Sequence, residues 1–453
     1  MANPVRIIGG GLAGSEAAWQ LVRRGVAVEL FEMRPERMTE AHATAHLGEL
    51  VCSNSLRSDS LSAPAGLLKA EMRLLDSLVI RIAEAHRVPA GSALAVDRES
   101  FSRALTALLE ALPGLRIVRC EVREIPADGV VILATGPLTS PALSEALARR
   151  LGEAHLYFYD AISPIVTAES IDMEIAFRAS RYDKGGEDYL NLPLTREEYD
   201  RFIEALLAAE RVPTRDFERF VPFEGCMPIE AMADRGKETL AHGPMRAVGL
   251  IDPRTKKRPY AAVQLRQENR EGTLYNLVGF QTKMTYGAQR KVFSLIPGLA
   301  RAEFVRLGSL HRNTFINAPA HLLPTLQWRQ RPTLFFAGQM TGVEGYVESA
   351  AAGLIAGINA AKLCAGKAPA TPPATTALGG LLRYITDPER KRFQPMNVNF
   401  GLLPPLDSRL ERRARKEALA RRALADMAAW AAQTDGGAAV AKNDEVHAVP
   451  GAP

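Results

Sequence analysis

The chain has 453 residues, of which 47% are apolar, 24% charged and 6% aromatic. This balance is typical of a globular protein with a large core, and it excludes a disordered chain, a collagen-like fibre and a disulfide-stapled miniprotein. Lys and Arg outnumber Asp and Glu by 56 to 51, and the formal net charge of +5 matters only where the excess is concentrated.

The chain opens with the pattern of a β-α-β unit. Residues 5–8 form a short apolar run, helical spacing of apolar residues follows from 15 to 24, and residues 26–32 predict a second strand. Residues 39–65 have little periodicity and many small polar side chains. We expect a long loop with short helical turns there, which is unusual inside a compact domain and indicates a functional segment.

The rest of the chain divides into a middle part of different character and a return to the first pattern. We predict helices at 67–86, 98–112, 196–211 and 348–363, and strands at 116–122, 130–134 and 333–338. Aromatic residues cluster and strands are short from about 157 to 298, so we interpret this part as an inserted domain. Residues 365–377 predict a linker, and the tail from 433 predicts disorder.

A glycine turn joins the first predicted strand to the first predicted helix. Gly9, Gly10, Gly11, Leu12, Ala13 and Gly14 satisfy the pattern G-x-G-x-x-G. In this pattern Gly9 permits a tight turn, Gly11 lets a pyrophosphate approach the backbone, and Gly14 allows close packing of the helix. The N-terminus of the helix would supply N–H donors to the anion. The alternative is a glycine turn without a ligand.

An acid and two further glycine turns bear on which nucleotide is bound. Glu32 ends the second predicted strand, where it can accept hydrogen bonds from ribose hydroxyls and disfavours the 2′-phosphate of NADP. S-adenosylmethionine also uses a glycine loop and an acid, so it competes with FAD. Two segments, Thr135-Gly136 and Gly338-Gln339, each end a predicted strand, and such segments approach FAD from opposite sides in two-dinucleotide-fold flavoproteins. These turns favour FAD.

The sequence therefore predicts an α/β fold, with a Rossmann-like FAD-binding domain of the two-dinucleotide-fold type interrupted by an inserted α+β domain. We expect the first part of the FAD-binding domain at 1–156, the inserted substrate domain at 157–298, and the second part with a basic C-terminal helix at 299–432. A disordered tail is expected at 433–453.

Four cysteines, Cys52, Cys120, Cys226 and Cys364, are widely spaced in the chain. This usage argues against a disulfide framework or a zinc site and indicates a reducing compartment. The N-terminus has no cleavable signal pattern, and no run approaches the roughly 18 apolar residues that a membrane span requires. We expect a cytosolic protein that contacts no membrane.

Basic residues are concentrated in two places. Residues 407–422 contain seven basic side chains against three acidic ones, and a short cluster contains Arg254, Lys256, Lys257 and Arg258. Both clusters are candidates for contact with the phosphates of a polyanion. A solvated surface with i,i+4 ion pairs explains either cluster equally well.

Several motifs resemble those of one known family, the bacterial folate- and FAD-dependent tRNA uracil-5-methyltransferases, which are related to the glucose-inhibited-division-type tRNA-modifying flavoproteins. The likeness runs from residue 5 to about residue 430, and the two cysteine-centred motifs are its most specific part. Besides Gly9–Gly14, the motifs are Glu32-Met33-Arg34-Pro35, Leu50-Val51-Cys52-Ser53-Asn54-Ser55, Phe223-Glu224-Gly225-Cys226-Met227-Pro228-Ile229-Glu230, His311-Arg312-Asn313-Thr314 and Gly338-Gln339-Met340-Thr341-Gly342-Val343-Glu344-Gly345-Tyr346.

The resemblance implies methylation of uridine 54 in the T-loop of tRNA. The carbon would come from 5,10-methylenetetrahydrofolate, the hydride from reduced FAD, and NAD(P)H would re-reduce the flavin. It also places Arg34 with the cofactor-binding residues. His311, Arg312 and Tyr346 could line the folate or flavin pocket, and Arg412, Arg413 and Lys416 are the candidates for tRNA contact within the basic segment. We expect no obligate protein partner.

The chemistry requires a nucleophile because uracil C5 reacts poorly by itself. A thiolate that adds at C6 converts the ring to an enolate that attacks a one-carbon electrophile, and a base must then remove the C5 proton. Cys120 and Cys364 have the surroundings of packing residues. Cys52 lies in an irregular polar loop and Cys226 follows a glycine, surroundings that a structural role explains equally well. The resemblance implies that these two act at C6 and C5, in an order that the sequence leaves open.

Three other functions remain open at this point. The first is a related flavoprotein that modifies another RNA uridine, in ribosomal RNA or at the tRNA wobble position. The second is a plain FAD-dependent NAD(P)H oxidoreductase or hydroxylase, against which the chain offers no second G-x-G-x-x-G. The third is a flavin-bearing, non-catalytic RNA-binding protein.

Overall fold

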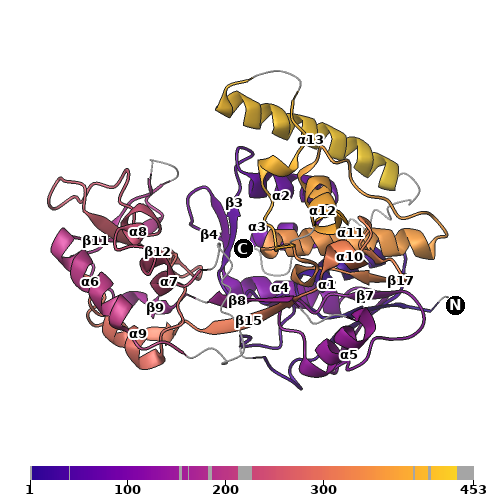
Figure 1. Cartoon of the computed structure of the whole chain (residues 1–453), viewed down its shortest axis with the longest axis horizontal. Helices are drawn as coiled ribbons and strands as arrows, with labels where there is room; N and C mark the ends of the chain where they lie inside the picture. The colour runs from indigo at the N-terminus through magenta and orange to yellow at the C-terminus, as the bar shows by residue number, and fades with distance from the viewer. Residues whose placement is uncertain are drawn as a thin grey trace.

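The computed structural model describes residues 3–39, 41–152, 156–161, 163–181, 186–212, 227–390, 393–406 and 410–435, with only the backbone at 156–161, 310–314, 412 and 435. Two six-stranded sheets organise this part of the chain, and Figure 1 shows them as two lobes. The cysteines Cys52, Cys120 and Cys364 form no disulfide. Within the described residues, no three His, Cys, Asp or Glu side chains gather as a metal site would require.

The first sheet is parallel apart from one edge strand, in the order β16-β17-β7-β1-β2-β6. Its strands are β1 (Val5–Ile8), β2 (Val28–Glu32), β6 (Leu115–Arg119), β7 (Val131–Leu133), β16 (Gln327–Trp328) and β17 (Arg331–Phe336). Strands β1, β2, β6 and β7 come from the first third of the chain and β17 from the last, so the sheet joins segments about 200 residues apart.

The second sheet is antiparallel, in the order β10-β11-β12-β13-β9-β14. Its strands are β9 (Ile165–Thr167), β10 (Phe177–Arg178), β11 (Tyr189–Leu194), β12 (Ala261–Gln267), β13 (Leu274–Leu277) and β14 (Phe304–Arg306). The sheet extends past residue 298, where we expected the insertion to end, because β14 pairs with β9. A two-stranded ribbon of β8 (Leu156–Ala161) and β15 (Leu310–Phe315) runs between the two lobes (Figure 1).

Each sheet has its own hydrophobic core. The core around the first sheet draws on residues up to Leu147 and again from Ile316 onward, whereas the second core draws on residues between Val166 and Leu299. A small three-stranded sheet, β3 (Ser55–Ser58), β5 (Ala93–Val96) and β4 (Arg87–Val88), adjoins the first core. Strand β3 stands where we expected only loop and helical turns.

Helices cover the sheets. They are α1 (Leu12–Val22), α2 (Pro64–Leu74), α3 (Leu78–Ala85), α4 (Arg98–Glu110), α5 (Pro141–Leu151), α6 (Arg196–Ala208), α7 (Ile229–Ala233), α8 (Thr239–His242), α9 (Tyr286–Phe293), α10 (Ala318–His321), α11 (Tyr346–Cys364), α12 (Ala377–Thr386) and α13 (Arg412–Asp435), with short 3-10 turns at Ala168–Ser170, Gln339–Thr341 and Phe400–Leu402. Helix α13 lies along one edge of the molecule beside α2 (Figure 1) and continues three residues into the segment that we expected to be disordered.

The single helix predicted at 67–86 is two helices. Asp76 adopts a left-handed backbone with φ +51°, and the Ser77 side chain caps the N-terminus of α3. The buried carboxylate of Glu16 on α1 then accepts hydrogen bonds from Ser77 Oγ and from the N–H groups of Leu78 and Val79. Because this partner lies about 60 residues away in the chain, periodicity alone could not reveal the break.

Helix α11 packs directly on α1 through glycines. A Cβ added at Gly353 would lie 2.1 Å from the carbonyl oxygen of Ala13, and one at Gly357 would lie 2.7 Å from that of Ala17. Among the described helices, α11 alone has the length and composition of a membrane span, contrary to our expectation that no segment approaches one, but 78% of its apolar window is buried inside the protein. It is a core helix of the first domain.

Candidate functional site

A cavity of the first domain opens at the carboxyl ends of its parallel strands, where ligands bind in open α/β sheets. Its open space is about 1010 Å³. Residues following four strands line it: Gly9 and Gly11 after β1, Glu32 and Arg34 at the end of β2, Thr135 and Gly136 after β7, and Gly338 and Gln339 after β17. Four segments that the sequence singled out separately therefore share one cavity.

The glycine turn has a different constraint at each glycine. Gly9 has φ +106°, and a Cβ there would lie 2.5 Å from the carbonyl oxygen of Ala134. A Cβ at Gly14 would lie 1.8 Å from the carbonyl oxygen of Gly9, so Gly14 lets α1 pack against the turn itself. A Cβ at Gly11 would meet no atom within 4 Å, because this residue faces the open cavity. Leu12 and Ala13, in the first turn of α1, also line the cavity.

Glu32 and Arg34 form a buried ion pair beside the turn. Arg34 Nε and Arg34 N both donate to Glu32 Oε1, at 2.9 and 3.0 Å, and Gly10 N donates to Glu32 Oε2 at 2.9 Å. Burial opposes ionisation of this carboxyl, but the hydrogen bonds and the charge of Arg34, with the Gly10 N–H, hold the pKa of Glu32 below its usual value. Gly10 therefore does not line the cavity but positions Glu32, which does.

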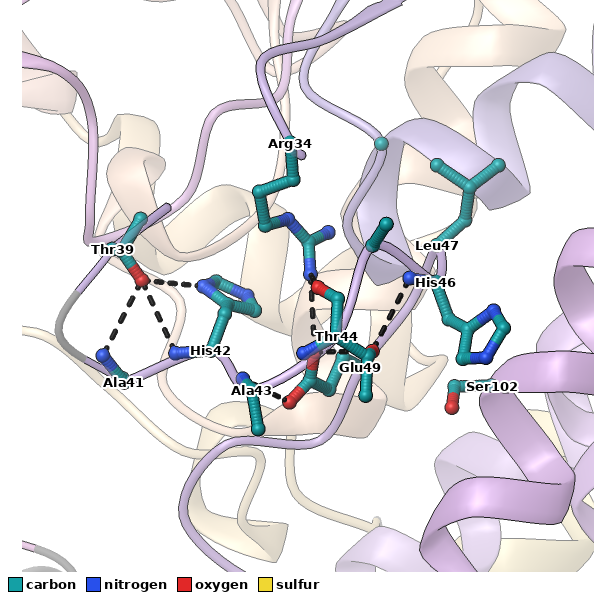
Figure 2. Close-up of polar contacts among 12 residues, drawn as sticks. Arg34, Thr39, Ala41, His42, Ala43, Thr44, His46, Leu47, Glu49 and Ser102 are labelled. Atoms are coloured by element: carbon teal, nitrogen blue, oxygen red, sulfur yellow. Dashed lines mark hydrogen bonds and ion pairs between the residues drawn. The ribbon is translucent and has the colours of Figure 1, made fainter. Parts of the chain in front are cut away.

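Glu49 organises the loop that closes this side of the cavity. Its carboxylate accepts hydrogen bonds from Ala43 N, Thr44 N and Thr44 Oγ1, and it also contacts Arg34 Nη1 at 3.2 Å. Figure 2 shows these contacts converging on Glu49, with the Thr39 hydroxyl beside the His42 ring at 2.6 Å. The loop predicted to be functional therefore has a fixed shape that the Arg34–Glu49 pair ties to β2.

The turns on the opposite wall are similarly fixed. The hydroxyl groups of Thr135 and Thr139 lie 2.6 Å apart, and Thr139 Oγ1 donates to the carbonyl oxygen of Gly136 at 3.0 Å. Gly338 has φ +77°, and a Cβ there would lie 2.9 Å from Ala13 Cβ. Gln339 is held by Glu344, with Nε2 donating to Oε2 at 2.7 Å.

This cavity has the chemistry of a dinucleotide site. The Gly11 turn faces open space at the N-terminus of α1, which suits a pyrophosphate. Glu32 Oε2 accepts one hydrogen bond from the described residues, so it keeps acceptor capacity for a ribose hydroxyl.

Cys52 lies next to this cavity, in a loop that three distant side chains hold. Tyr346, at the start of α11, accepts hydrogen bonds from Cys52 N at 2.7 Å and from Ser53 N at 3.1 Å, and it lines the cavity. Arg98 Nη1 donates to the carbonyl oxygen of Leu50 at 2.8 Å. Arg266 Nη2 donates to Ser53 Oγ at 2.8 Å.

The same loop is anchored to the second sheet by Asn54. Its Oδ1 accepts a hydrogen bond from Arg266 Nε at 2.9 Å, and its Nδ2 donates to the carbonyl oxygens of Val96 and Gln267, both at 3.0 Å. Cys52 is thereby placed at the junction between the two domains. The sequence placed Ser53 and Asn54 in this loop but did not indicate their partners.

Positive charge surrounds the Cys52 loop. Arg98, Arg266 and Arg306 each interact electrostatically with Cys52. Burial opposes the charge of Arg98, but the neighbouring Glu268 carboxylate raises its pKa above the usual value; at Arg266 and Arg306, burial dominates and lowers the pKa. Desolvation and the nearby Cys52 raise the pKa of Tyr346, so its hydroxyl keeps its proton at neutral pH.

Of the remaining predicted site residues, some lie wholly or partly outside the part of the chain that the structure describes. Cys226 lies outside the described residues, as do the side chains of His311, Arg312 and Arg412. His311 and Arg312 stand on β15, opposite Asp160 and Tyr159 of the ribbon. Cys120, which we interpreted as a packing residue, lines the cavity just past β6, and Cys364 is exposed at the end of α11.

Some of the basic side chains predicted to contact RNA have structural partners within the protein, and others are exposed. Arg254 is engaged by Asp252, and Arg422 donates to the carbonyl oxygens of Pro404 and Pro405, so both have structural partners. Arg413 is exposed and pairs with Glu417 one turn later. The remaining exposed members with described side chains are Lys256, Lys257, Arg258, Arg415 and Arg421, and Lys416 lies over the Phe400 ring at 5.9 Å.

Sequence reasoning missed Arg98, Arg266, Glu268 and Arg306. Only one signal could have indicated them: Arg266 and Glu268 are charged residues in or beside a β12 segment that is otherwise buried. Nothing in the sequence connects them with residue 52.

Comparisons with known proteins agree with this geometry. The family model of glucose inhibited division protein A matches residues 4–368. The methylenetetrahydrofolate–tRNA-(uracil-5-)-methyltransferase TrmFO of Moorella thermoacetica is 61% identical over 94% of this chain and 97% of its own length. The protein of the same name from Geobacter sulfurreducens is 60% identical over 95% of this chain and 100% of its own length.

Among solved structures, GidA of Aquifex aeolicus is similar in fold. Its form I crystal structure has a TM-score of 0.70 at 19% sequence identity, and the match covers 98% of this chain and 77% of that one. The form II crystal gives a TM-score of 0.69. The fold is thus that of an α/β FAD-dependent oxidoreductase similar to GidA, and the chain belongs to the glucose inhibited division protein A family and, within it, to the TrmFO family.

Proposed function

We propose that the protein methylates C5 of uridine 54 in the T-loop of tRNA, with 5,10-methylenetetrahydrofolate as carbon donor, reduced FAD as hydride donor and NAD(P)H as the reductant of the flavin. The observation that carries this proposal is the hydrogen bonding of Cys52 and Ser53 to Tyr346, a residue that lines the dinucleotide cavity. A candidate nucleophile and a candidate redox cofactor thus meet at one place. The names of the relatives support the same substrate and carbon donor.

The proposal assigns the first domain to FAD and the second, inserted domain to the RNA. Two separate cores support this division, since the first draws on both ends of the chain and the second on the middle. Cys52 lies between the cavity at the carboxyl edge of the first sheet and the second domain. The nucleotide substrate would therefore enter between the two domains. We infer a cytosolic enzyme that acts without an obligate protein partner.

The cavity residues bind and orient the cofactor. Gly11 and the N-terminus of α1 receive the pyrophosphate, Glu32 accepts from a ribose hydroxyl, and Arg34 keeps Glu32 ionised and in place. Thr135, Gly136, Gly338 and Gln339 form the opposite wall. Reduced FAD, when bound there, supplies the hydride that converts a methylene group into a methyl group.

Cysteine chemistry activates the pyrimidine. We assign one of Cys52 and Cys226 to addition at uracil C6, which makes C5 nucleophilic, and the other to proton transfer at C5. Arg98 and Arg306 both interact electrostatically with Cys52. His311 and Arg312 on the ribbon, together with Tyr346, are proposed to contact folate or flavin. Arg412, Arg413 and Lys416 on α13 are proposed to contact tRNA phosphates.

One experiment separates this function from its alternatives. The purified protein is tested for bound flavin and is then given unmodified tRNA with labelled methylenetetrahydrofolate or labelled S-adenosylmethionine. We expect label at tRNA from folate alone; label from S-adenosylmethionine alone, or a colourless protein that takes up no FAD, contradicts the proposal. Parallel assays with ribosomal RNA distinguish the related flavoproteins.

Cysteine variants test the assigned chemistry. We expect Cys52→Ala and Cys226→Ala each to abolish methylation while flavin stays bound, because neither thiol is assigned to cofactor binding. Cys364→Ala is the matched control, since Cys364 is exposed at the end of α11, and it should keep wild-type activity. Full activity in both Cys52→Ala and Cys226→Ala would remove these residues from the mechanism.

A further inference from the structure

A second cavity adjoins the dinucleotide cavity across Glu49, which lines both. Its open space is about 960 Å³. Arg98 at the start of α4, Glu268 just after β12 and Arg306 at the end of β14 contribute to its walls, so both domains form it. The dinucleotide motifs account for none of these three residues.

Arg98 and Glu268 are paired with each other but not fully satisfied. Arg98 Nη2 lies 2.5 Å from Glu268 Oε1, and the two side chains are 15% and 5% exposed. Among the described residues, Arg98 Nε and Glu268 Oε2 have no hydrogen-bond partner although both atoms are buried. Two neighbouring side chains in the wall of a cavity thus each keep a buried polar atom without a partner among the described residues, which is costly unless a ligand completes them.

These residues share one electrostatic neighbourhood with the candidate nucleophile. Arg306 interacts with Arg98, Tyr346, Cys52 and Glu268. Arg98 also holds the backbone of the Cys52 loop through the carbonyl oxygen of Leu50. A group that occupies this cavity beside Arg98 and Glu268 therefore contacts a side chain that also positions the Cys52 loop.

Uracil has the complementary edge. Its N3–H is a donor between two carbonyl acceptors, O2 and O4, so the edge can donate to a carboxylate while it accepts from a guanidinium group. Cytosine presents an unprotonated N3 in the same position, and its lone pair would face the carboxylate. A carboxylate at this point therefore selects uracil over cytosine.

We propose that the target uracil is read in this second cavity, with Glu268 Oε2 accepting the N3–H and the guanidinium groups of Arg98 and Arg306 donating to the flanking carbonyl oxygens. Glu268 is then the residue that determines base specificity, and the inference rests on the proposed function. The same contacts would hold the ring beside the Cys52 loop, whose backbone Arg98 also contacts. No covalent step is assigned to Glu268.

The test compares Glu268→Gln with wild type on two tRNAs, one with uridine and one with 3-methyluridine at the target position. Gln keeps the shape and a carbonyl oxygen for Arg98. We expect kcat/KM for the uridine tRNA to fall roughly 10- to 150-fold, the range for a hydrogen bond to a charged group. The wild-type preference for uridine over 3-methyluridine should shrink by a similar factor, because the variant no longer depends on the N3–H.

Glu145→Gln is the matched control, since Glu145 is exposed on α5, lines neither cavity and undergoes the same change of charge. It should leave both the rate and the preference unchanged. Flavin content and melting temperature report folding, and Glu268→Asp, which keeps the charge but withdraws the carboxylate, provides a second variant with the same expected loss of preference.

The outcomes are distinct. A Glu268→Gln enzyme that loses activity equally on both tRNAs would assign Glu268 to support of the Cys52 loop and overturn base recognition. Full activity on the uridine tRNA would overturn it as well. A wild-type protein that methylates no tRNA from folate would instead refute the proposed function, and the inference with it.

Discussion

Replacing Gly11 by alanine should weaken FAD binding, whereas replacing Gly14 by alanine should lower the stability of the fold, although the two glycines belong to one motif. A methyl group at Gly11 meets no atom within 4 Å and projects into the cavity, whereas one at Gly14 lies 1.8 Å from the carbonyl oxygen of Gly9. Gly11 has φ −73° and ψ −170°, a conformation that alanine adopts without strain. We therefore expect Gly11→Ala to fold normally and to lose FAD affinity.

The size of each effect follows from these contacts. Displacing the pyrophosphate from one or two backbone N–H groups costs about 1.5–3 kcal/mol for each charged hydrogen bond, so the FAD dissociation constant of Gly11→Ala should rise roughly 100-fold. In Gly14→Ala the helix or the turn must move by more than about 1 Å, and such overpacking costs about 1–3 kcal/mol. The melting temperature of the flavin-free protein should fall by roughly 2–10 °C.

Flavin titration and thermal unfolding of the flavin-free variants measure the two quantities separately. Gly287→Ala is a useful control for the general effect of replacing a glycine, because Gly287 has no left-handed φ, no atom lies within 4 Å of its Cβ position, and it does not line the cavity. Wild-type FAD affinity in Gly11→Ala would refute the placement of the pyrophosphate. Equal loss of melting temperature in Gly11→Ala and Gly14→Ala would refute the steric distinction.

Two further predictions concern a buried lysine and the basic helix. Burial lowers the pKa of Lys69 to about 8. Between pH 8 and about 10.4 the unfolded chain therefore binds more protons than the folded protein, because the lysine is still protonated only in the unfolded chain. The contribution of Lys69 to the unfolding free energy thus rises with pH in this range. The unfolding free energy of wild type relative to Lys69→Met should therefore increase across this range by up to about 1.4 kcal/mol per pH unit, and a constant difference in denaturant titrations would contradict the shift. Replacing Arg413 and Arg415 on α13 by Glu should weaken tRNA binding. The slope of log binding constant against log salt concentration should become shallower by about one for each lost phosphate contact. An unchanged slope in binding assays would assign the helix to solubility.

Local chemistry made part of the site predictable from sequence. The glycine turn, the strand before it, the helix after it and the acid at the end of β2 lie within 32 residues, and their spacing alone predicts their arrangement. The turns at Thr135-Gly136 and Gly338-Gln339 were predictable for the same reason, since each ends a parallel strand. Cys52 could be singled out because it lies in a polar segment with no periodicity.

Other features depend on partners that are distant in the chain. The break between α2 and α3 depends on Glu16 of α1. The end of the second sheet depends on the pairing of β14 with β9, which no local pattern reveals. The recognition residues Arg98, Glu268 and Arg306 come from α4, β12 and β14, so they meet only when the two domains meet.

The amino-acid sequence by itself determined that a dinucleotide turn exists, which acid accompanies it, and which cysteine stands in an irregular loop, because those properties depend on neighbours a few residues away. The tertiary structure alone decided what surrounds the cysteine. Tyr346 reaches Cys52 across 294 residues and Arg266 reaches Ser53 across 213. Hydrogen bonds of that separation require distant segments of the chain to pack together, so no pattern along the chain records them.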